Sequence, residues 1–354
     1  MGPAGDHDRW PGAVNAHTHV YSGLSSLGMP RPAEQPRSFL EILERIWWRL
    51  DRALDEKSLF AAARLYLGEA LLSGTTVIVD HHESPSFIDG SLDVIADAAQ
   101  EVGIRLATGY GATERNGGRG EARAGLAECR RFARENRRPL VRALVGLHAS
   151  FTVSDETIRE AGDLARELAC PVHVHAGEDR LDVDDARRRG HRGPLERLRV
   201  LGGLPPGSIL AHAVHLDARQ VAAADAADCF LVQNPRSNEA NRVGYPPALA
   251  RSRRVALGTD GFPADMAAER AALLRIGLAH GEATDVLDAR ARWGRALGEA
   301  LFGSLAGDAV TCGGRRVAVA GEVVVEDGRL VRADIDEIRA RAREEARRLF
   351  ARMA

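Results

Sequence analysis

Residues 13–19 read AVNAHTH, a short apolar run that ends in two histidines separated by one threonine. Side chains two residues apart on a β-strand project from the same face. His17 and His19 are therefore expected to point the same way at the carboxyl end of a first strand. Seven further apolar, strand-forming runs follow along the chain, at 75–80, 104–110, 140–148, 171–177, 208–214, 229–234 and 254–260.

Helical patterns separate most of these runs, such as SLDVIADAAQEVG at 91–103 and SDETIREAGDLARELA at 154–169. Apolar strands that alternate with helices are typical of a parallel sheet buried on both faces. Eight such units favour an α/β fold of the (β/α)8 TIM-type barrel class over an open doubly wound sheet. No GxGxxG follows the first strand, which argues against a dinucleotide-binding fold. We expect residues 1–305 to form the barrel.

The pattern changes after residue 303. Residues 315–331 alternate with period two and contain Glu326-Asp327-Gly328, which is a hairpin-turn signal. The stretch DIDEIRARAREEARRLFARM then predicts a charged helix that Asp334 or Asp336 caps. We therefore expect residues 306–354 to form a small appendage, a β-hairpin with a C-terminal helix, and not a second functional domain.

The composition excludes several classes of protein. The formal net charge is −2 over 354 residues, which offers no electrostatic basis for binding nucleic acid or an anionic membrane. Four isolated cysteines without a CxxC pair argue against a zinc ribbon or a disulfide framework and fit a reducing cytosol. No apolar run reaches the roughly 18 residues of a membrane span. The N-terminal residues also lack the apolar region of a signal peptide, so we expect a cytoplasmic location.

Most of the 12 histidines fall where a predicted strand ends, and active sites of such barrels lie at the carboxyl ends of the strands. The His17–His19 pair on strand 1 is joined by His175 on strand 5, His212 on strand 6 and Asp260 on strand 8. Imidazoles with a carboxylate suit a borderline divalent metal such as zinc or ferrous iron. The pattern therefore predicts a metal site. His173, one pleat deeper than His175, is expected to be a hydrogen-bonded core residue.

Five motifs, NAHTH, VHVHAGE, LAHAVHL, NPRSN and LGTDG, occur in that order between residues 15 and 261. In this order they resemble the amidohydrolase superfamily, specifically its mononuclear deaminase branch. The stretches SFLEILERIWWRLDRALDE, VDHHESPSFIDGSLD and GLHASFTVSDET resemble the SsnA-like aminohydrolases within that branch. The resemblance implies a barrel enzyme that hydrolyses C–N bonds other than peptide bonds, of the cyclic amidine aminohydrolase type.

The same resemblance implies which residues bind the metal, namely His17, His19, His175 and Asp260. Binuclear members of the superfamily use a bridging carboxylated lysine on strand 4. The sole lysine of this chain, Lys57, lies in a predicted helix far from any strand end. We therefore expect one divalent ion per chain, zinc first and Fe(II) as the alternative.

Three residues carry the chemistry that the resemblance implies. Asp260 accepts the proton of the attacking water, His212 polarises that water, and Glu178 is the acid three residues past His175. The expected reaction is the attack of metal-activated water on an sp² carbon of an amino-substituted heterocycle or cyclic amidine, with release of ammonia. Two alternatives stay open: an amidohydrolase of a biosynthetic pathway that cleaves or closes a ring without releasing ammonia, and a catalytically silent binding protein.

Several further residues are candidates for contact with a small-molecule substrate. The candidates share a place at a strand end or on the helix after strand 1, where aromatic rings can stack on a flat heterocycle. They are His148, His81, His82, Trp47, Trp48, Asn234 and Asn238.

The ends of the chain differ from the superfamily pattern. Only 12 residues precede the first predicted strand, where family members carry a longer segment that forms part of a small β-sandwich. Some C-terminal strands also look deleted. Residues 317–325, VAVAGEVVV, would then lack their usual cover. Two outcomes are open: the hairpin packs onto the barrel beneath the C-terminal helix, or it is buried against a second subunit. A free apolar edge invites pairing with another chain, so we favour the second and expect a homodimer whose interface includes or adjoins this hairpin.

Overall fold

The computed structural model describes residues 9–353, and in it the eight predicted strands form one nearly closed barrel. Neighbouring strands pair in parallel and in chain order, and a parallel bridge between Thr18 and Asp260 links the last strand to the first. The fourth strand is interrupted at Leu144 and so has two parts. This arrangement confirms the predicted (β/α)8 barrel. The strands are β2 (Ala13–Thr18), β3 (Thr75–His82), β4 (Arg105–Ala112), β5 (Val141–Ala143) with β6 (Val145–Ala149), β7 (Val172–Ala176), β8 (Ile209–His212), β9 (Phe230–Gln233) and β10 (Val255–Leu257).

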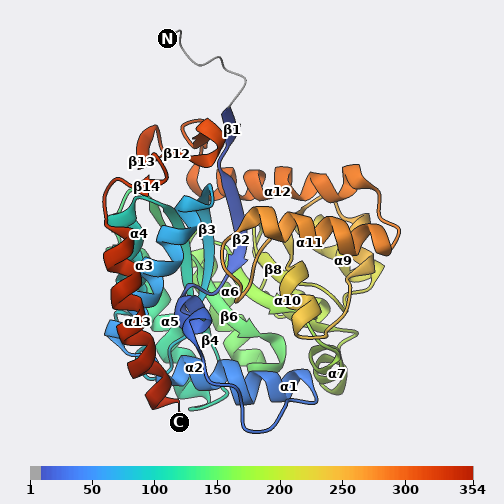
Figure 1. The fold of residues 1–354 in the computed structure, drawn as a ribbon. Helices are drawn as coiled ribbons and strands as arrows, with labels where there is room; N and C mark the ends of the chain where they lie inside the picture. Colours follow the sequence, from blue (N-terminus) through green and yellow to red (C-terminus); the bar gives the residue numbers. More distant parts are fainter. Residues whose placement is uncertain (1–8, 354) are drawn as a thin grey trace.

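Helices surround the strands (Figure 1). Ser154 caps the helix after β6 by accepting a hydrogen bond from the Thr157 N–H, and Gly103 ends the helix after β3 at φ 85°. The helices are α3 (Glu56–Leu72), α4 (Ser91–Val102), α5 (Arg119–Glu135), α6 (Asp155–Leu168), α7 (Arg180–Arg188), α8 (Pro194–Val200), α9 (Ala218–Ala226), α10 (Pro235–Ala240), α11 (Met266–Ala279) and α12 (Thr284–Phe302), with 3₁₀ turns at Ser150–Thr152 and Pro247–Arg251.

Burial on both faces of the sheet explains why the strand runs read as apolar. Every residue of β3 and of β4 is buried, and Ile78 and Leu106 belong to the main hydrophobic core together with apolar residues of α3, α4 and α5. Each fully buried aliphatic side chain of this kind stabilises the fold by about 1.5–3 kcal/mol. The core therefore holds the strands in place and fixes the position of the polar residues at their carboxyl ends.

The segment after β2 lies over the carboxyl end of the barrel. It contains a 3₁₀ turn (Val20–Leu27), α1 (Phe39–Ile42), a π-helical turn (Leu43–Trp47) and α2 (Trp48–Ala53). π-Helical turns are rare and are frequent at functional sites. We refer to residues 39–53 as the aromatic cover, because Phe39, Trp47 and Trp48 belong to one apolar cluster there.

A second, antiparallel sheet stands at one end of the barrel, in the order β1-β11-β12-β13-β14 (Figure 1). The predicted turn is present between β13 and β14, with Asp327 at φ 50° and Gly328 at φ 76°, and Asp334 caps the C-terminal helix as one of the two predicted caps. The elements are β1 (Arg9–Pro11), β11 (Ala309–Thr311), a 3₁₀ turn (Cys312–Gly314), β12 (Arg316–Val319), β13 (Glu322–Glu326), β14 (Arg329–Leu330) and α13 (Ile335–Arg352).

Of the two expected outcomes for this hairpin, the structure shows burial within its own chain. Val317, Val319, Val324 and Val325 are each at most 1% exposed and belong to the main core of the chain itself. The physical reason is that the sheet packs on α3 and α4, while α13 lies along α3 (Figure 1). Helices of the same chain thus bury the apolar face that we expected in a dimer interface. The homodimer stays a prediction without that support, and the division at residue 305 stays one too.

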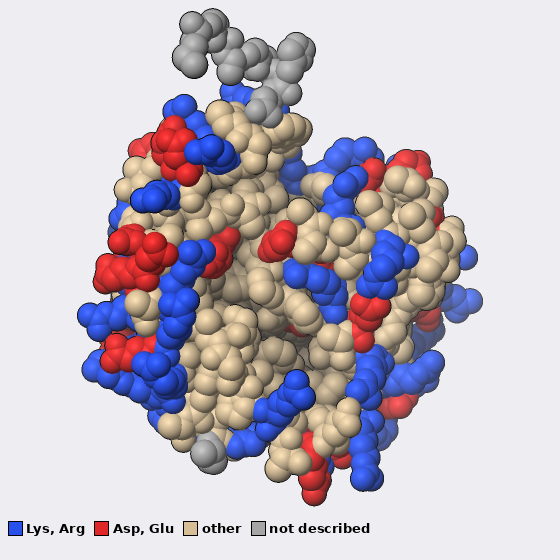
Figure 2. Space-filling model, viewed as in Figure 1, with Lys and Arg blue, Asp and Glu red and all other residues tan. Residues whose placement is uncertain are grey.

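The surface mixes charges of both signs. On the face in Figure 2, arginines and acidic residues are interspersed around a hollow with mostly uncharged walls. Among residues 9–353, no helix is both long and apolar enough to cross a membrane.

Candidate active site

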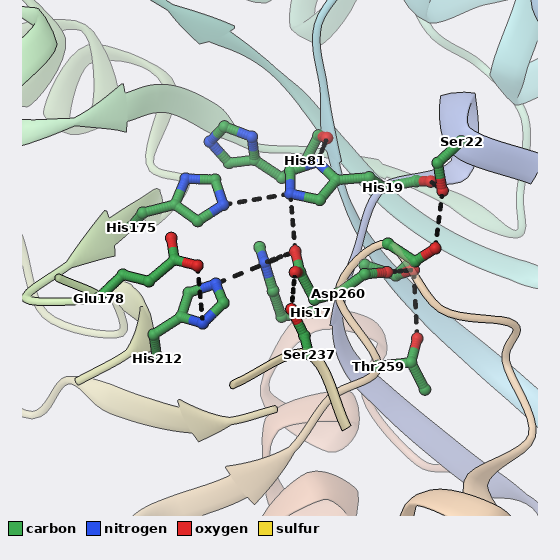
Figure 3. A network of polar contacts seen from close by, with 12 residues as sticks. His17, His19, Ser22, His81, His175, Glu178, His212, Ser237, Thr259 and Asp260 are labelled. Carbon is green, nitrogen blue, oxygen red and sulfur yellow. Dashed lines mark hydrogen bonds and ion pairs between the residues drawn. The ribbon is translucent and has the colours of Figure 1, made fainter. Parts of the chain in front are cut away.

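The polar residues predicted from the strand ends meet in the barrel around the Asp260 carboxylate (Figure 3). His19 Nε2 lies 3.0 Å and His17 Nε2 lies 3.3 Å from Asp260 Oδ1. His175 Nε2 lies 3.1 Å from His19 Nε2. The barrel thus brings the four predicted metal ligands together from β2, β7 and the loop after β10.

The outer ring nitrogen of each of these histidines has a hydrogen-bond partner. Such bonds fix the tautomer and aim the inner nitrogen at a metal, as is usual for ligand histidines. His173, the deeper histidine of β7, is fully buried and takes part, as expected for a core residue. The pairs are His19 Nδ1 donating to the His81 carbonyl at 2.7 Å, His175 Nδ1 donating to the His148 carbonyl at 2.6 Å, and His17 Nδ1 with His173 Nε2 at 2.9 Å.

The donor set fits a divalent cation. Ligand atoms of His17, His175, His212 and Asp260 all lie within 4.8 Å of one another, and His19 belongs to a second such group with His81 and His175. His17 Nε2 and His212 Nε2 are buried and have no hydrogen-bond partner among residues 9–353. Burial lowers the pKa of His17 to about 3, so its imidazole is neutral, which is the form that binds metal. Neutral imidazoles with one carboxylate are the ligands that zinc prefers in catalytic sites.

The backbone at Asp260 is in a sparsely populated conformation. Asp260 has φ 53° and His212 has φ 71°, both in the left-handed region that non-glycine residues rarely adopt. Hydrogen bonds hold Asp260 there: its N–H donates to the His17 carbonyl at 3.0 Å, and its carbonyl accepts from Thr18 Oγ1 at 2.7 Å. Residues held in such conformations gather at active sites.

Asp260 and Glu178 have opposite protonation preferences. Burial would raise the pKa of Asp260, but the adjacent His17 and His19 imidazoles hold it well below its usual range. Burial and the neighbouring Asp260 raise the pKa of Glu178 well above its usual range. His212 lies between them, with Nδ1 3.6 Å from Glu178 Oε1 and Nε2 3.9 Å from Asp260 Oδ1. The site therefore holds one carboxylate that favours the ionised form and one carboxyl group that favours the protonated form.

A pocket opens from this cluster toward the aromatic cover. Of the predicted substrate contacts, His148 and Trp47 line it. Its other walls come from the metal cluster, the cover and the loops after β6 and β7. These residues are His19, Tyr21, Phe39, Leu43, Glu83, Ala149, Phe151, His175, Glu178, Asp179, Asp182, Asn241, Asp260 and Gly261.

The other five candidates lie behind the pocket wall. His81 Nε2 donates to the Leu147 carbonyl at 2.9 Å, and His82 Nε2 shares a 2.8 Å hydrogen bond with Ser84 Oγ. Asn238 Oδ1 accepts a 2.9 Å hydrogen bond from His212 Nδ1. Trp48 and Asn234 are likewise not among the described residues that line the pocket. Direct contact of these five with substrate stays a prediction.

One pocket residue, Glu83, was not among the residues predicted from the sequence. It follows Asp80-His81-His82 at the end of β3, so its place at a strand end was the available signal. Glu83 is 2% exposed, and its Oε1 has no hydrogen-bond partner within the part of the chain that the structure describes. Oε1 lies 3.5 Å from His81 Nδ1 and 3.8 Å from His148 Nε2. A buried acceptor without a donor is a candidate for binding a donor group of a substrate.

Comparisons with known proteins agree with this geometry. The amidohydrolase family profile matches residues 10–294. A 5′-deoxyadenosine deaminase of Methanopyrus kandleri is 28% identical over 93% of this chain and 83% of that protein. Two 5-methylthioadenosine/S-adenosylhomocysteine deaminases, of Moorella thermoacetica and Thermoanaerobacter pseudethanolicus, are 32% and 28% identical over 78% and 71% of this chain. The alignments span only 64% and 57% of those two proteins.

Solved structures share the fold. A zinc-bound adenosine deaminase of Xanthomonas campestris has a TM-score of 0.80 at 24% identity, over 96% of this chain and 85% of that one. A zinc-containing mutant of an atrazine chlorohydrolase of Arthrobacter aurescens has a TM-score of 0.77 at 22% identity, over 96% and 88%.

The family match covers four-fifths of the sequence and every strand of the barrel. It confirms the resemblance stated from the motifs and the prediction of an enzyme that hydrolyses C–N bonds other than peptide bonds. The assignment of single ligands and catalytic residues stays a prediction. By its sequence and its fold, the chain belongs to the amidohydrolase family.

Proposed function

We propose that this chain is a zinc-dependent hydrolytic deaminase of an adenosine-type nucleoside, which replaces the exocyclic amino group with oxygen and releases ammonia. The observation that carries the proposal is the pair of carboxyl groups with opposite protonation preferences, Asp260 and Glu178, on either side of His212. Deamination needs one group that accepts a proton and another that donates one.

His17, His19, His175 and Asp260 would hold one zinc ion, with Fe(II) as the alternative. A bound zinc ion lowers the pKa of a water molecule to about 7 and so supplies a nucleophile near neutral pH. Asp260, kept ionised, accepts the proton of the attacking water, and His212 Nε2 orients that water. Glu178 donates its proton to a ring nitrogen, which makes the neighbouring carbon more electrophilic. Asp260 then passes the proton that it took from the water to the amino group, which leaves as ammonia, and the proton of the newly attached hydroxyl returns to Glu178 as the carbonyl forms.

The pocket chemistry supports a neutral nucleoside. Five acidic residues line it, and none of its described lining residues is lysine or arginine, so a phosphate group would be repelled. Trp47 and Phe151 offer flat apolar surfaces for a purine, and the free Glu83 Oε1 can accept hydrogen bonds from ribose hydroxyls. The relatives named as deaminases of 5′-deoxyadenosine and of 5-methylthioadenosine support the same substrate class.

The experiment is a measurement of ammonia release by the purified, zinc-loaded chain from 5′-deoxyadenosine, 5′-methylthioadenosine, adenosine and adenosine 5′-phosphate. We expect turnover of the uncharged nucleosides and at least about a tenfold lower kcat/KM for the phosphate, a discrimination of ~1.4 kcal/mol. Ring opening of a heterocycle without ammonia would instead support the alternative hydrolase. A chain that binds zinc but turns over no heterocycle would support the silent binding protein.

We also propose that the chain works as a homodimer in the cytoplasm. Its four cysteines are free thiols, which supports a reducing compartment. Static light scattering at micromolar concentration tests the assembly, and a monomer mass would contradict it.

A further inference from the structure

A buried cluster of one arginine and two acidic residues lies between the aromatic cover and the pocket. Arg115, in the loop after β4, places Nη2 2.5 Å from Asp51 Oδ2 of α2 and 2.9 Å from Glu83 Oε2. The three side chains are at most 5% exposed. The guanidinium carbon also lies 5.0 Å from the centre of the Trp48 ring. Arg115 therefore touches the cover at two residues and the pocket at one.

The cluster sets one basic group against two acidic groups. One guanidinium faces two carboxylates, and burial raises the pKa of Glu83 to about 7. Without the guanidinium, two carboxylates would stand close together in a site of low polarity, where like charges repel strongly. The position of Glu83 thus depends on Arg115, and the position of Arg115 depends on Asp51 and Trp48.

The pocket is narrow in this structure. Its free volume is about 40 Å³. Pockets that bind small molecules typically measure about 300–1,000 Å³. Phe39, Leu43 and Trp47 of the aromatic cover supply part of its wall. Movement of the cover would enlarge the pocket for a substrate of nucleoside size, and its return would exclude water.

We propose that Arg115 is a positioning residue that couples closure of the aromatic cover to the orientation of Glu83. When the cover is closed, Asp51 and Trp48 seat the guanidinium, the guanidinium holds Glu83 Oε2, and Glu83 Oε1 is left facing the pocket as an acceptor. This inference rests on the proposed nucleoside deaminase, because Glu83 needs a hydroxyl donor from the substrate. In this proposal Arg115 touches neither the substrate nor the metal, but it sets the affinity of the pocket for the ribose through Glu83.

The test compares Arg115→Met with Arg105→Met. Arg105 is a matched control at the other end of β4: it pairs with Asp308 in a buried ion pair and stacks near Phe302 at 5.7 Å. With a nucleoside substrate, Arg115→Met should raise KM about 10–100-fold, the usual cost of losing a supporting partner of a site residue. The kcat value and the zinc content should change less than threefold, and Arg105→Met should leave both constants near wild type.

The substrate supplies a second comparison. With a 2′,3′-dideoxynucleoside, which offers Glu83 no hydroxyl, the KM effect of Arg115→Met should shrink to less than threefold. An equal effect on both substrates, or a wild-type KM for Arg115→Met, would overturn the proposal. If Arg115→Met does not fold, Asp51→Asn replaces it, and a KM unchanged with the full nucleoside would overturn the proposal in the same way.

A readout without turnover separates this inference from the proposed function. In a Trp10→Phe background, which removes an exposed tryptophan, acrylamide should quench tryptophan fluorescence more strongly in Arg115→Met than in wild type or Arg105→Met. If wild type deaminates no nucleoside, the proposed function fails while increased quenching still supports the coupling to the cover. If wild type deaminates nucleosides and quenching is the same in all three proteins, the coupling fails and the function stands.

Discussion

Strand β4 has a buried arginine near each of its ends, and the two arginines are held very differently. At the amino end, Arg105 makes hydrogen bonds at 3.0–3.2 Å to both oxygens of Asp308, and Asp308 also accepts from the Ala320 N–H. At the carboxyl end, Arg115 Nε and Nη1, Asp51 Oδ1 and Glu83 Oε1 all lack hydrogen-bond partners within residues 9–353. The Arg105–Asp308 pair at the amino end is thus held by several hydrogen bonds, whereas the cluster at the carboxyl end contains buried polar atoms without a partner.

Histidines at the carboxyl end of the barrel show the same lack of partners. The buried polar atoms that lack partners within the described chain include ring nitrogens of His17, His81, His82 and His212, all at the carboxyl ends of strands. Leaving a buried polar group unpaired costs about 1–3 kcal/mol. These ring nitrogens are therefore candidates for binding a ligand. The amino end, where the small sheet packs, contributes to stability, and the carboxyl end contributes to chemistry.

The largest effect is expected when a predicted metal ligand is removed. His17→Ala should lose the metal and at least about 10⁴-fold in kcat/KM, because nucleophile generation and substrate polarisation fail together. Elemental analysis per chain and ammonia release measure the two losses. If His17→Ala keeps one equivalent of metal, His17 is not a metal ligand. Two equivalents of metal in wild type would contradict the single-ion prediction.

The next effect belongs to the proton donor. Glu178→Gln should keep the metal and lower kcat by about 10²–10⁴-fold, the usual contribution of a general acid–base group. Glu128→Gln is the control, because Glu128 is a 2% exposed carboxylate that pairs with Arg131 on α5, far from the pocket. A Glu178→Gln enzyme within a few-fold of wild type would remove Glu178 from proton transfer.

At the amino end, a comparable change should affect stability alone. Arg105→Met leaves Asp308 as an unpaired buried charge, which should lower the free energy of unfolding by about 3–5 kcal/mol. The activity of the folded fraction should stay within twofold of wild type. Chemical denaturation and kcat/KM on the same preparation measure both quantities. A loss of activity in the folded Arg105→Met protein would show that the amino end of the barrel also affects catalysis.

The smallest effect is expected at a histidine that stands behind the pocket wall. His82 is fully buried and bonds to Ser84. His82→Gln should change kcat/KM less than threefold and lower the free energy of unfolding by about 1 kcal/mol, the net worth of one hydrogen bond. Steady-state kinetics with a thermal unfolding curve decide this. A tenfold rise in KM would restore His82 as a substrate contact.

Much of the site could be predicted from local patterns. Strand periodicity places His17 with His19 and His173 with His175, and closure of an eight-stranded barrel brings β2 beside β10, so that His17 meets Asp260. The alternation of side chains along β3 did not reveal whether His81 or His82 faces the centre of the barrel, because every residue of this strand is buried. The hairpin was predicted correctly, but its burial against α3 and α4 depends on helix positions that the alternation does not encode.

The amino-acid sequence by itself determined the barrel and the convergence of histidines with an aspartate at its carboxyl end, because both follow from the regular spacing of residues along strands and helices. Its five ordered motifs indicated the family by resemblance. Only the tertiary structure decided that Asp51, Glu83 and Arg115 share one buried cluster. It also decided that the aromatic cover forms part of the pocket wall. Asp51 and Arg115 are 64 residues apart, and Glu83 and Arg115 are 32 apart, in segments without a common period. Contacts of that kind depend on how loops pack after the barrel has formed, because packing and desolvation, not local spacing, select the partner.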